Sequence, residues 1–588
     1  MQERVLLARV LSAMVVMAYV LIGVLGHDPW KQDETYTFGI IEHMFKTGDW
    51  VVPTNAGQPF MEKPPLYAWT ACAFIWLLGH WLPVFDAARL ASAFFTAITL
   101  LFLARSVREV YELPDLTDAR VAGTLAVFAS TLMVVKHSHD LMTDAALLAG
   151  ASIALYGMLS LALSLERAGR WRRRMMPYPV GRDESVPIVE AGRLSSSSRA
   201  GLWLGLGVGL AMMAKGVFMP LVFGVTAVAI AVLIPACRER RYGYALLLAT
   251  LVFVPFATIW PMALAHRSPA LFKVWFWDNN IGRFFGFSVS RLGAENDKHL
   301  FILRALLTSA FPIGPLALLG MMRGSLHRLR NAAMAVPFVL CAVGSAVLSL
   351  SATARQLYLL PFAPALALLA CDALPRLPAR LHRGWDYLSR VMVAIGMVAI
   401  WGAWAIMGRP LEEHAVLERL SRWLPLDYVL VTPRPAVALA VLLTLGWAVA
   451  IRLAPRTGAW CGAVSWAASI GVLWGLTFTL LLPWIDYSKN YRTVYRDLAK
   501  TIAPLWQVGD CMASSNLGES EAPMLELYTG IEHRPLEVQP TTSCRWLIVQ
   551  YEGQAATRPP GNWVPVWGGS RPDDDEQILR VYWRKDLP

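Results

Sequence analysis

The sequence predicts an all-α polytopic membrane protein with a small α/β domain at its C-terminal end. Composition is the first indication: 56% of the 588 residues are hydrophobic and 16% are charged, with a mean hydropathy of +0.45, whereas about 25% of residues in soluble proteins are charged. Many apolar runs also reach the ~20 residues that a helix needs to cross a bilayer. The basic residues, which give a net charge of +11, collect between these runs, as they do on the cytoplasmic side of membranes.

The excess of positive charge therefore indicates membrane topology. The sequence contains no basic stripe with interleaved aromatic residues, so we expect no nucleic-acid partner. The seven cysteines show no metal-ligand spacing. Two of them, Cys511 and Cys544, fall in the polar C-terminal segment, where an oxidising compartment would allow a disulfide. The sequence leaves open whether they pair.

The first crossing is expected at residues 5–25, with Arg4 and Arg9 at its start. No A-x-A cleavage pattern follows it, so we interpret it as an uncleaved membrane helix whose N-terminus is cytoplasmic.

The loop that follows, residues 27–86, is predicted to be the catalytic face of the protein. It contains Asp33 and Glu34 near its start, and Glu62 and Lys63 before a double proline. Charges between membrane-length apolar runs are costly and usually mark a site. Apolar residues at helical spacing within 37–45 predict a helix that lies in the membrane interface.

The run 66–82 is also predicted not to cross the membrane. It is short and is bounded by prolines, and counting it as a crossing would place Arg105 and Arg108 outside, against the charge rule.

With this choice the chain makes about thirteen crossings with basic residues inside. The further crossings are expected at 87–103, 121–135, 144–163, 201–214, 219–236, 245–262, 301–321, 335–350, 358–370, 391–407, 436–450 and 464–482. Residues 166–199 are predicted to be a mobile cytoplasmic loop, and 266–299 and the segment around Glu412 and Glu413 to be external. The membrane domain is therefore 1–483. Residues 484–588 form an external soluble domain, with strands at 546–551 and 578–583.

In this topology the charged residues that lack flanking basic clusters all fall on the external face. They are Asp33, Glu34, Glu62, Lys63, Asp140, Asp144, Lys215, Asp278, Arg283 and Arg355. Their convergence predicts one cavity at the outer leaflet, suited to group transfer from a charged lipid. Cations would neutralise a leaving phosphate, and a carboxylate would orient or deprotonate the acceptor.

We predict Lys63, Lys215 and Arg283 as the phosphate ligands and Asp33, Glu34 and Asp144 as the catalytic acids. Each residue also has a simpler interpretation. The acids are common helix caps and first-turn residues, Glu62 with Lys63 is a plausible surface pair, and Lys215 and Tyr358 suit a membrane interface.

Several motifs resemble the glycosyltransferase 39 superfamily, which contains protein O-mannosyltransferases and bacterial lipid A aminoarabinose transferases. They are DET at 33–35, GDWVVP at 48–53, EKPPLYAW at 62–69, MTDAALL at 142–148, AKG at 214–216, FWDNNIGRFF at 276–285 and SATARQLYLLPFAPALALL at 351–369. The resemblance covers roughly residues 5–370. It is closer to the aminoarabinose branch, where this loop opens with DET and closes with EKP.

The resemblance implies a GT-C fold, a polyprenyl-phosphate sugar donor used on the external side, and an inverting mechanism with no required cofactor. It places Asp33, Glu62 and Lys63 in the active site. The same cavity is then lined by Asp144, Lys215, Arg283 and Tyr358, and we expect Arg355 of the external charges to lie there too.

The chain also departs from the family pattern. Tyr36 and Thr37 follow DET in place of arginine and tyrosine, Phe60 replaces a tyrosine, and Arg355 replaces a lysine. Asp278, Asn279 and Asn280 stand where some relatives offer a histidine that helps a metal-binding glutamate. Glu62 and Asp278 are thus the only candidates for a divalent cation, and the sugar need not be aminoarabinose.

The sequence therefore predicts a glycosyltransferase of the bacterial inner membrane with a periplasmic C-terminal domain. Its expected partners are an undecaprenyl-phosphate sugar, lipid A or another glycolipid or protein acceptor, and membrane lipids. A protein O-mannosyltransferase-like enzyme and a flippase for lipid-linked sugars are the open alternatives. A flippase predicts mid-bilayer charges and inverted repeats, whereas the charges here gather at one face.

Overall fold

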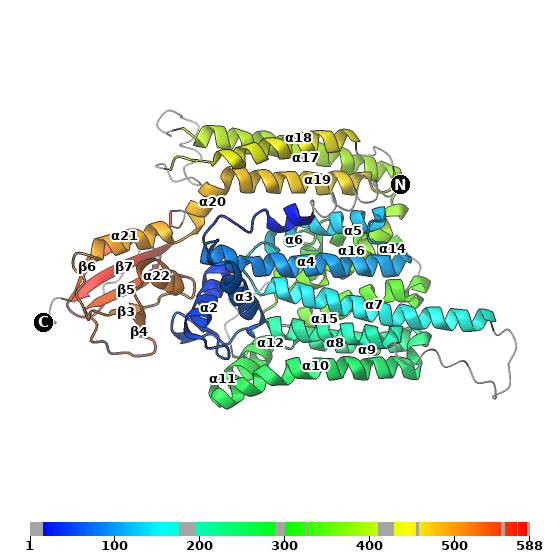
Figure 1. The fold of residues 1–588 in the computed structure, drawn as a ribbon, viewed down its shortest axis with the longest axis horizontal. Coiled ribbons are helices and arrows are strands. Elements are labelled where there is room, and N and C mark those ends of the chain that lie inside the picture. Colours follow the sequence, from blue (N-terminus) through cyan, green and yellow to red (C-terminus); the bar gives the residue numbers. More distant parts are fainter. Residues whose placement is uncertain are drawn as a thin grey trace.

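The computed structural model describes residues 16–175, 195–288, 300–323, 326–409, 428–453, 458–553, 559–572, 574 and 576–584. Its helices run side by side in a long bundle, and a domain with a β-sheet lies at one end of that bundle (Figure 1). The predicted fold class, a helical membrane protein with a small α/β domain, is confirmed.

Within the described ranges, eight helical segments are long and apolar enough to span a membrane. They are α4 (Val84–Tyr111), α7 (Asp144–Met175), α10 (Arg240–Arg267), α15 (Ala332–Leu350), the run Gln356–Arg376 (η4, Gln356–Phe362; α16, Ala363–Ala373; η5, Leu374–Arg376), α17 (Ala379–Met407), α18 (Arg434–Leu453) and the run Cys461–Lys489 (α19, Cys461–Leu476; η7, Thr477–Leu481; α20, Leu482–Lys489). Shorter apolar helices are α3 (Leu66–Leu78), α5 (Ala119–Ala129), α9 (Phe218–Leu233) and α14 (Ile313–Arg323), and α8 (Ser196–Lys215) packs against α7. The total of about thirteen crossings stays a prediction, since most of the first one, and the segment around Glu412, lie outside the described residues.

Two predicted crossings are interrupted. The run 121–135 divides into α5 and α6 (Leu132–His137), and 301–321 divides into α13 (Phe301–Leu307) and α14. The two breaks bond to each other: the amides of Leu132 and Met133 donate to the carbonyls of Phe311 and Ser309 at 3.0 and 2.9 Å. Backbone groups freed from a helix inside a membrane protein need such partners, and a pairing between distant segments leaves no local signal in the sequence.

The prediction of a polar loop over 166–199 is wrong at both ends, because α7 continues to Met175 and α8 begins at Ser196. Arg167 explains part of this extension. It forms ion pairs with Glu109 at 2.6 Å and Glu112 at 2.9 Å, which fix α7 to the end of α4. The predicted external loop 266–299 also contains helical turns. It starts with the end of α10, which follows the short helix η1 (Pro235–Arg238), and continues with α11 (Pro269–Lys273), the π-helical η2 (Val274–Gly282) and α12 (Arg283–Phe285).

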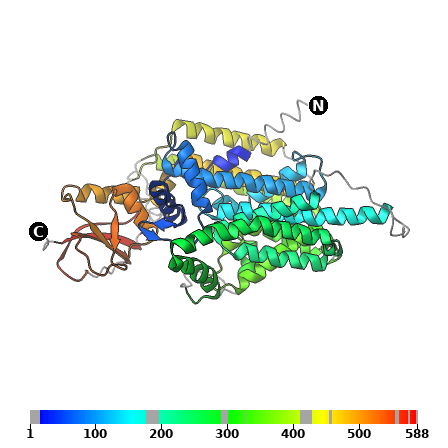
Figure 2. The same ribbon diagram turned by 60° about the horizontal axis from the view of Figure 1, so that its bottom comes forward.

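The loop predicted to be catalytic lies at the end of the bundle that faces the C-terminal domain. It consists of α2 (Asp33–Thr47), a hairpin of β1 (Thr54–Asn55) and β2 (Gln58–Pro59), and α3. In both views α2 lies between the bundle and the domain (Figures 1 and 2). At about 1.5 Å per residue, α3 is too short for a ~30 Å hydrocarbon layer, in agreement with the prediction that 66–82 does not cross.

The C-terminal domain follows α20, in which the predicted boundary at residue 484 lies. It contains α21 (Arg492–Ile502), α22 (Glu521–Thr529) and the strands β3 (Met512–Ser515), β4 (His533–Pro535), β5 (Trp546–Glu552), β6 (Trp563–Gly569) and β7 (Gln577–Arg584). The strand order is β4-β3-β5-β7-β6, with β3 parallel to β4 and β5 and the remaining pairs antiparallel. Both predicted strands are confirmed, and Cys511 and Cys544 form a disulfide.

Candidate active site

Asp33, Tyr36 and Lys63 form a hydrogen-bonded chain at the start of α2. The Tyr36 hydroxyl donates to Asp33 Oδ1, and Lys63 Nζ donates to Tyr36 Oη at 2.7 Å. Burial raises the pKa of the Asp33 carboxyl, but the charge of Lys63 and the Tyr36 hydrogen bond outweigh burial and hold the pKa below its usual value. Asp33 is therefore an ionised carboxylate at neutral pH.

Lys215 and Asp144 form a second charged pair, at the ends of two adjacent helices. Lys215 ends α8 and Asp144 begins α7, and Lys215 Nζ lies 2.5 Å from Asp144 Oδ1. The Asp144 side chain is 1% exposed, so this carboxylate has little room for a second partner. Lys215 Nζ also lies 4.7 Å from the centre of the Tyr358 ring on η4, a cation–π contact that holds the ammonium between the two residues.

Arg283 and Glu62 form the third pair. Arg283, the first residue of α12, places Nη1 3.1 Å from Glu62 Oε1. The Arg283 Nε atom is buried and has no hydrogen-bond partner within the described ranges. A buried guanidinium donor without a partner is costly, and it is available to an anionic ligand.

The position of Lys215 depends on the next residue, Gly216. Gly216 has a φ of +82°, which favours glycine, and a side chain there would collide with Asn280. Asn280 in turn accepts a hydrogen bond from the amide of Val217 at 3.1 Å and donates to the carbonyl of Trp275 at 2.8 Å. The AKG and FWDNN motifs thus contact each other, and together they fix the end of α8.

The three pairs belong to one group. The charges of Asp33, Lys215 and Glu62 all act on Lys63, and Arg283 interacts with Glu62, Tyr358 and Tyr36. The structure therefore brings together seven of the predicted site residues, which are Asp33, Glu62, Lys63, Asp144, Lys215, Arg283 and Tyr358. Three cations and three carboxylates from separate segments can bind an anionic group and balance charge that develops on it.

The hydrogen bonds of Glu34 do not favour the predicted catalytic role. Its carboxylate is buried and accepts from Arg89 Nε at 2.8 Å, from the amide of Leu141 at 2.7 Å and from the amide of Trp30 at 3.0 Å. These protein donors occupy both oxygens, as in a structural ion pair, so the geometry favours a positioning role for Glu34.

Three further predicted residues, Asp278, Asp140 and Arg355, belong to none of the three pairs. The backbone carbonyl of Asp278 accepts a hydrogen bond from Ser288 Oγ at 2.6 Å. Asp140 lies 3.3 Å from His137 Nδ1. Arg355 directly precedes η4, three residues before Tyr358. No three His, Cys, Asp or Glu side chains of the described ranges converge on a possible metal position, and the partner of Glu62 is Arg283.

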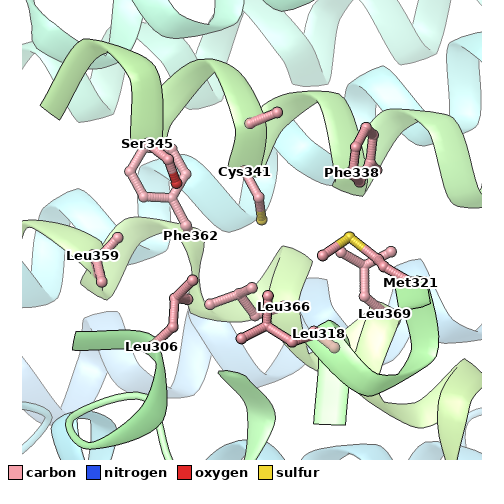
Figure 3. Close-up of a pocket in the computed structure, with 12 residues that line it drawn as sticks. Leu306, Leu318, Met321, Phe338, Cys341, Ser345, Leu359, Phe362, Leu366 and Leu369 are labelled. Carbon is pink, nitrogen blue, oxygen red and sulfur yellow. The ribbon is translucent and has the colours of Figure 1, made fainter. Parts of the chain in front are cut away.

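An apolar cavity of about 200 Å³ lies in the bundle beside η4. Phe338, Cys341 and Ser345 of α15 face side chains of α13, α14 and α16 across it (Figure 3). Helix η4 contributes Leu359 and Phe362 to this lining and Tyr358 to the charged group. One short helix therefore borders both the charged group and an apolar space deeper in the bundle.

Some residues that complete the charged group are not among the predicted site residues. Tyr36 departs from the family pattern, but its i, i+3 spacing from Asp33 is a signal that both lie on one helix face. Arg89 is an isolated arginine in an apolar run, which is itself a signal. Asn280 belongs to the FWDNNIGRFF motif, but its contact with the AKG motif is a tertiary one. Glu519, which interacts with the charged group from the C-terminal domain, has no signal in the local sequence.

No protein-family model matches the chain. It is 27% identical to the undecaprenyl phosphate-alpha-4-amino-4-deoxy-L-arabinose arabinosyl transferase 1 of Sodalis glossinidius over 449 residues, which cover 74% of this chain and 69% of that protein. It is 24% identical to the corresponding transferase of Serratia proteamaculans over 483 residues, 79% of this chain and 74% of the other.

The fold is similar to that of ArnT from Cupriavidus metallidurans in two crystal structures. The structure with bound undecaprenyl phosphate gives a TM-score of 0.65 at 16% identity and 98% coverage of both chains. The apo structure gives 0.62 at 16% identity and 97% coverage of both. At this identity the solved structures bear on the fold, and the likeness in sequence comes from the transferases above. Together they support the resemblance that the motifs carry, to ArnT-like glycosyltransferases with a GT-C fold.

Proposed function

We propose that this protein transfers a sugar from an undecaprenyl-phosphate donor to a lipid acceptor of the bacterial envelope, with lipid A as the preferred acceptor. The observation that carries the proposal is the convergence of Lys63, Lys215 and Arg283, from three separate segments, around two tyrosines at one end of the bundle. The curated relatives are named for transfer from an undecaprenyl-phosphate amino sugar, and the similar crystal structure contains undecaprenyl phosphate. Both support a donor of this class.

The three cations bind the phosphate of the donor in this proposal. Lys215 and Arg283 each form an ion pair with a carboxylate, and Lys63 is linked to Asp33 through the Tyr36 hydroxyl. Arg283 Nε offers an additional donor. As the bond to the sugar breaks, negative charge grows on the phosphate, and fixed cations stabilise that charge more than the ground state. These side chains supply the positive charge that the step requires, so the proposal includes no resident cofactor.

The apolar cavity beside η4 accommodates part of the donor's hydrocarbon chain. Its lining is almost entirely aliphatic and aromatic, and Leu359 directly follows Tyr358, which contacts Lys215. A lipid whose phosphate lies at Lys215 can therefore pass its chain along η4 into the bundle.

The transfer itself is a single displacement with inversion. An acceptor oxygen attacks the anomeric carbon while the bond from that carbon to the phosphate oxygen breaks, and undecaprenyl phosphate leaves with the electron pair. Asp33, whose pKa is lowered chiefly by Lys63 against the effect of burial, is a poor base at neutral pH and instead orients the acceptor. This favours an acceptor that is already anionic, such as a lipid A phosphate, over a serine or threonine hydroxyl.

The site faces the periplasm in this proposal. The chain is a multi-pass membrane protein, and the C-terminal domain that covers the site contains the Cys511–Cys544 disulfide, as expected of an oxidising compartment. The N-terminus then lies in the cytoplasm, as its basic residues predict.

Reconstitution tests the proposal. Purified protein in vesicles, given undecaprenyl phosphate-4-amino-4-deoxy-L-arabinose and lipid A, should form glycosylated lipid A and release undecaprenyl phosphate, both detected by mass spectrometry. Lys215→Met should reduce this rate by about 10²–10³-fold, and Lys46→Met, which changes a lysine that is 67% exposed, should not. Movement of the donor between leaflets without any glycosylated product would instead establish the flippase alternative.

A further inference from the structure

The C-terminal domain contacts the catalytic loop through the segment 516–520, between β3 and α22. Asn55 Nδ2, in the hairpin, donates to the carbonyl of Glu519 at 2.9 Å. Ser520 Oγ donates at 3.2 Å to the carbonyl of Gln32, the residue before Asp33. Gly39 of α2 packs so closely against Pro523 and Asn55 that a side chain there would collide with both. The segment is thus joined to the catalytic loop at two positions.

The segment also has a fixed conformation within its own domain. The amide of Gly518 donates to Gln550 Oε1 at 2.8 Å, and the amide of Asn516, which has a φ of +55°, donates to Glu537 Oε1 at 2.6 Å. Glu521, at the start of α22, is paired with Lys31 at 3.3 Å. Side chains of this segment are therefore presented to the site in a defined place.

Glu519 is the residue of this segment that faces the charged group. The charges that act on it are those of Glu62, Lys63, Asp33 and Arg283. Its side chain is exposed, and its carboxylate forms no ion pair or hydrogen bond with another residue in the described chain. Glu521, two residues on, has both kinds of partner.

The charge balance of the site indicates what Glu519 binds. Lys63, Lys215 and Arg283 are balanced by Asp33, Glu62 and Asp144, and the last two of these form direct pairs. Glu519 adds a further carboxylate, and a sugar phosphodiester would add another negative charge. A cationic group on the ligand would offset this excess and would be stabilised by it.

We propose that Glu519 is a specificity-determining residue of the transfer site, supplied by the C-terminal domain, and that its carboxylate binds a primary ammonium group of the ligand. The inference rests on the proposed function for the identity of the site. The ammonium belongs either to the sugar that is transferred or to the acceptor, and the chemistry at Glu519 is the same in both cases. The C-terminal domain then completes the active site.

The test compares wild type with Glu519→Gln in the full-length protein. Binding is measured, without acceptor, for three probes: undecaprenyl phosphate-4-amino-4-deoxy-L-arabinose, the same donor with its amine acetylated, and undecaprenyl phosphate without sugar. We expect Glu519→Gln to weaken binding of the amine donor about tenfold, the loss of one charge-assisted hydrogen bond. Binding of the other two probes should stay unchanged. Glu532→Gln, the same change at another exposed acid of this domain, should leave all three unchanged.

A second measurement, the KM for the acceptor, shows whether the ammonium lies on the donor or on the acceptor. Together with the rate of sugar transfer, it also distinguishes failure of this inference from failure of the proposed function. If donor binding is unchanged but the KM for the acceptor rises in Glu519→Gln, the ammonium lies on the acceptor and the inference holds. If Glu519→Gln alters neither donor binding nor acceptor KM, or weakens sugar-free undecaprenyl phosphate equally, the inference is overturned. Binding of the amine donor that depends on Glu519 without any sugar transfer would support the inference and contradict the proposed function.

Discussion

Asp33 and Glu34 are adjacent acids that have opposite surroundings. Glu34 turns into the protein and meets Arg89, whose side chain is fully buried and whose guanidinium also donates to Asp86 at 3.0 Å. Asp33 turns to the Tyr36 hydroxyl and, through it, to Lys63. Both oxygens of the Glu34 carboxylate therefore have protein donors. The Asp33 carboxylate belongs to a group with a donor that is still available to a ligand.

The difference shows how this membrane protein uses its buried charge. Arg89 also donates to the carbonyls of Val24, His27 and Asp28, so the cluster joins the chain before α2 to α4 and sets the direction in which α2 begins. A buried ion pair of this kind adds little net stability but is costly to break. The closed cluster around Arg89 positions the open one around Lys63.

The largest effect is expected from breaking the closed cluster. Arg89→Ala leaves Glu34 and Asp86 buried without their cation, and should lower the free energy of unfolding by about 3–5 kcal/mol. Thermal unfolding of the purified protein measures the loss. Arg105→Ala removes a half-buried arginine of the same helix, which lies 5.0 Å from the Phe102 ring, and should cost about 1 kcal/mol. Equal stability losses in the two variants would contradict the structural role of Arg89.

Asp33→Asn should keep the stability of the fold but lower the rate of sugar transfer about 10²-fold, because the carboxylate that orients the acceptor is removed. Glu34→Gln, at the neighbouring residue, should mainly lower the free energy of unfolding. Since Lys63 and Tyr36 lower the Asp33 pKa against burial, acidification should reduce wild-type turnover through Asp33 only below the ordinary pKa of an aspartate. Turnover assays and melting curves on both variants check the contrast. Equal turnover of Asp33→Asn and wild type would remove Asp33 from the mechanism.

The sequence predicted one side of this comparison better than the other. Asp33, Glu62, Lys63 and Lys215 stand out because each interrupts apolar sequence, and that cost is visible in one dimension. The partners are not visible. Glu34 meets an arginine 55 residues away, and Asn55 meets Glu519 across 464 residues, so whether an acid is closed or open depends on tertiary pairing. The same limit explains the paired breaks at Leu132 and Phe311, where each segment taken alone favours a continuous helix.

A smaller effect is expected at the Tyr36 hydroxyl, which links Asp33 to Lys63. Tyr36→Phe keeps the ring under Lys63, at 4.8 Å from Nζ, and removes only the bridge. We expect kcat/KM to decrease about 10-fold, the value of a hydrogen bond to a charged group, with an unchanged melting temperature. Tyr244→Phe, at an exposed tyrosine of α10, is the matched control. A wild-type kcat/KM for Tyr36→Phe would show that Lys63 and Asp33 act independently.

The smallest expected effect concerns a third acid, Glu526 of α22, on which the charges of Glu532 and Glu42 act more strongly than that of Lys46. Burial, followed by the charges of Glu532 and Glu42, raises the pKa of Glu526 to about 7, above its ordinary value of 4.5. The folded protein therefore holds this proton more tightly than the unfolded chain, and stability should fall as the pH rises from 4.5 to about 7, then level off. Because Glu526 is half-exposed, we expect its share to stay below about 1 kcal/mol. Glu526→Gln should remove this decline in stability from melting curves recorded between pH 5 and 8. The control variant Glu552→Gln, at an exposed end of β5, should retain the decline. A decline of the same size in Glu526→Gln would show that another group binds the responsible proton.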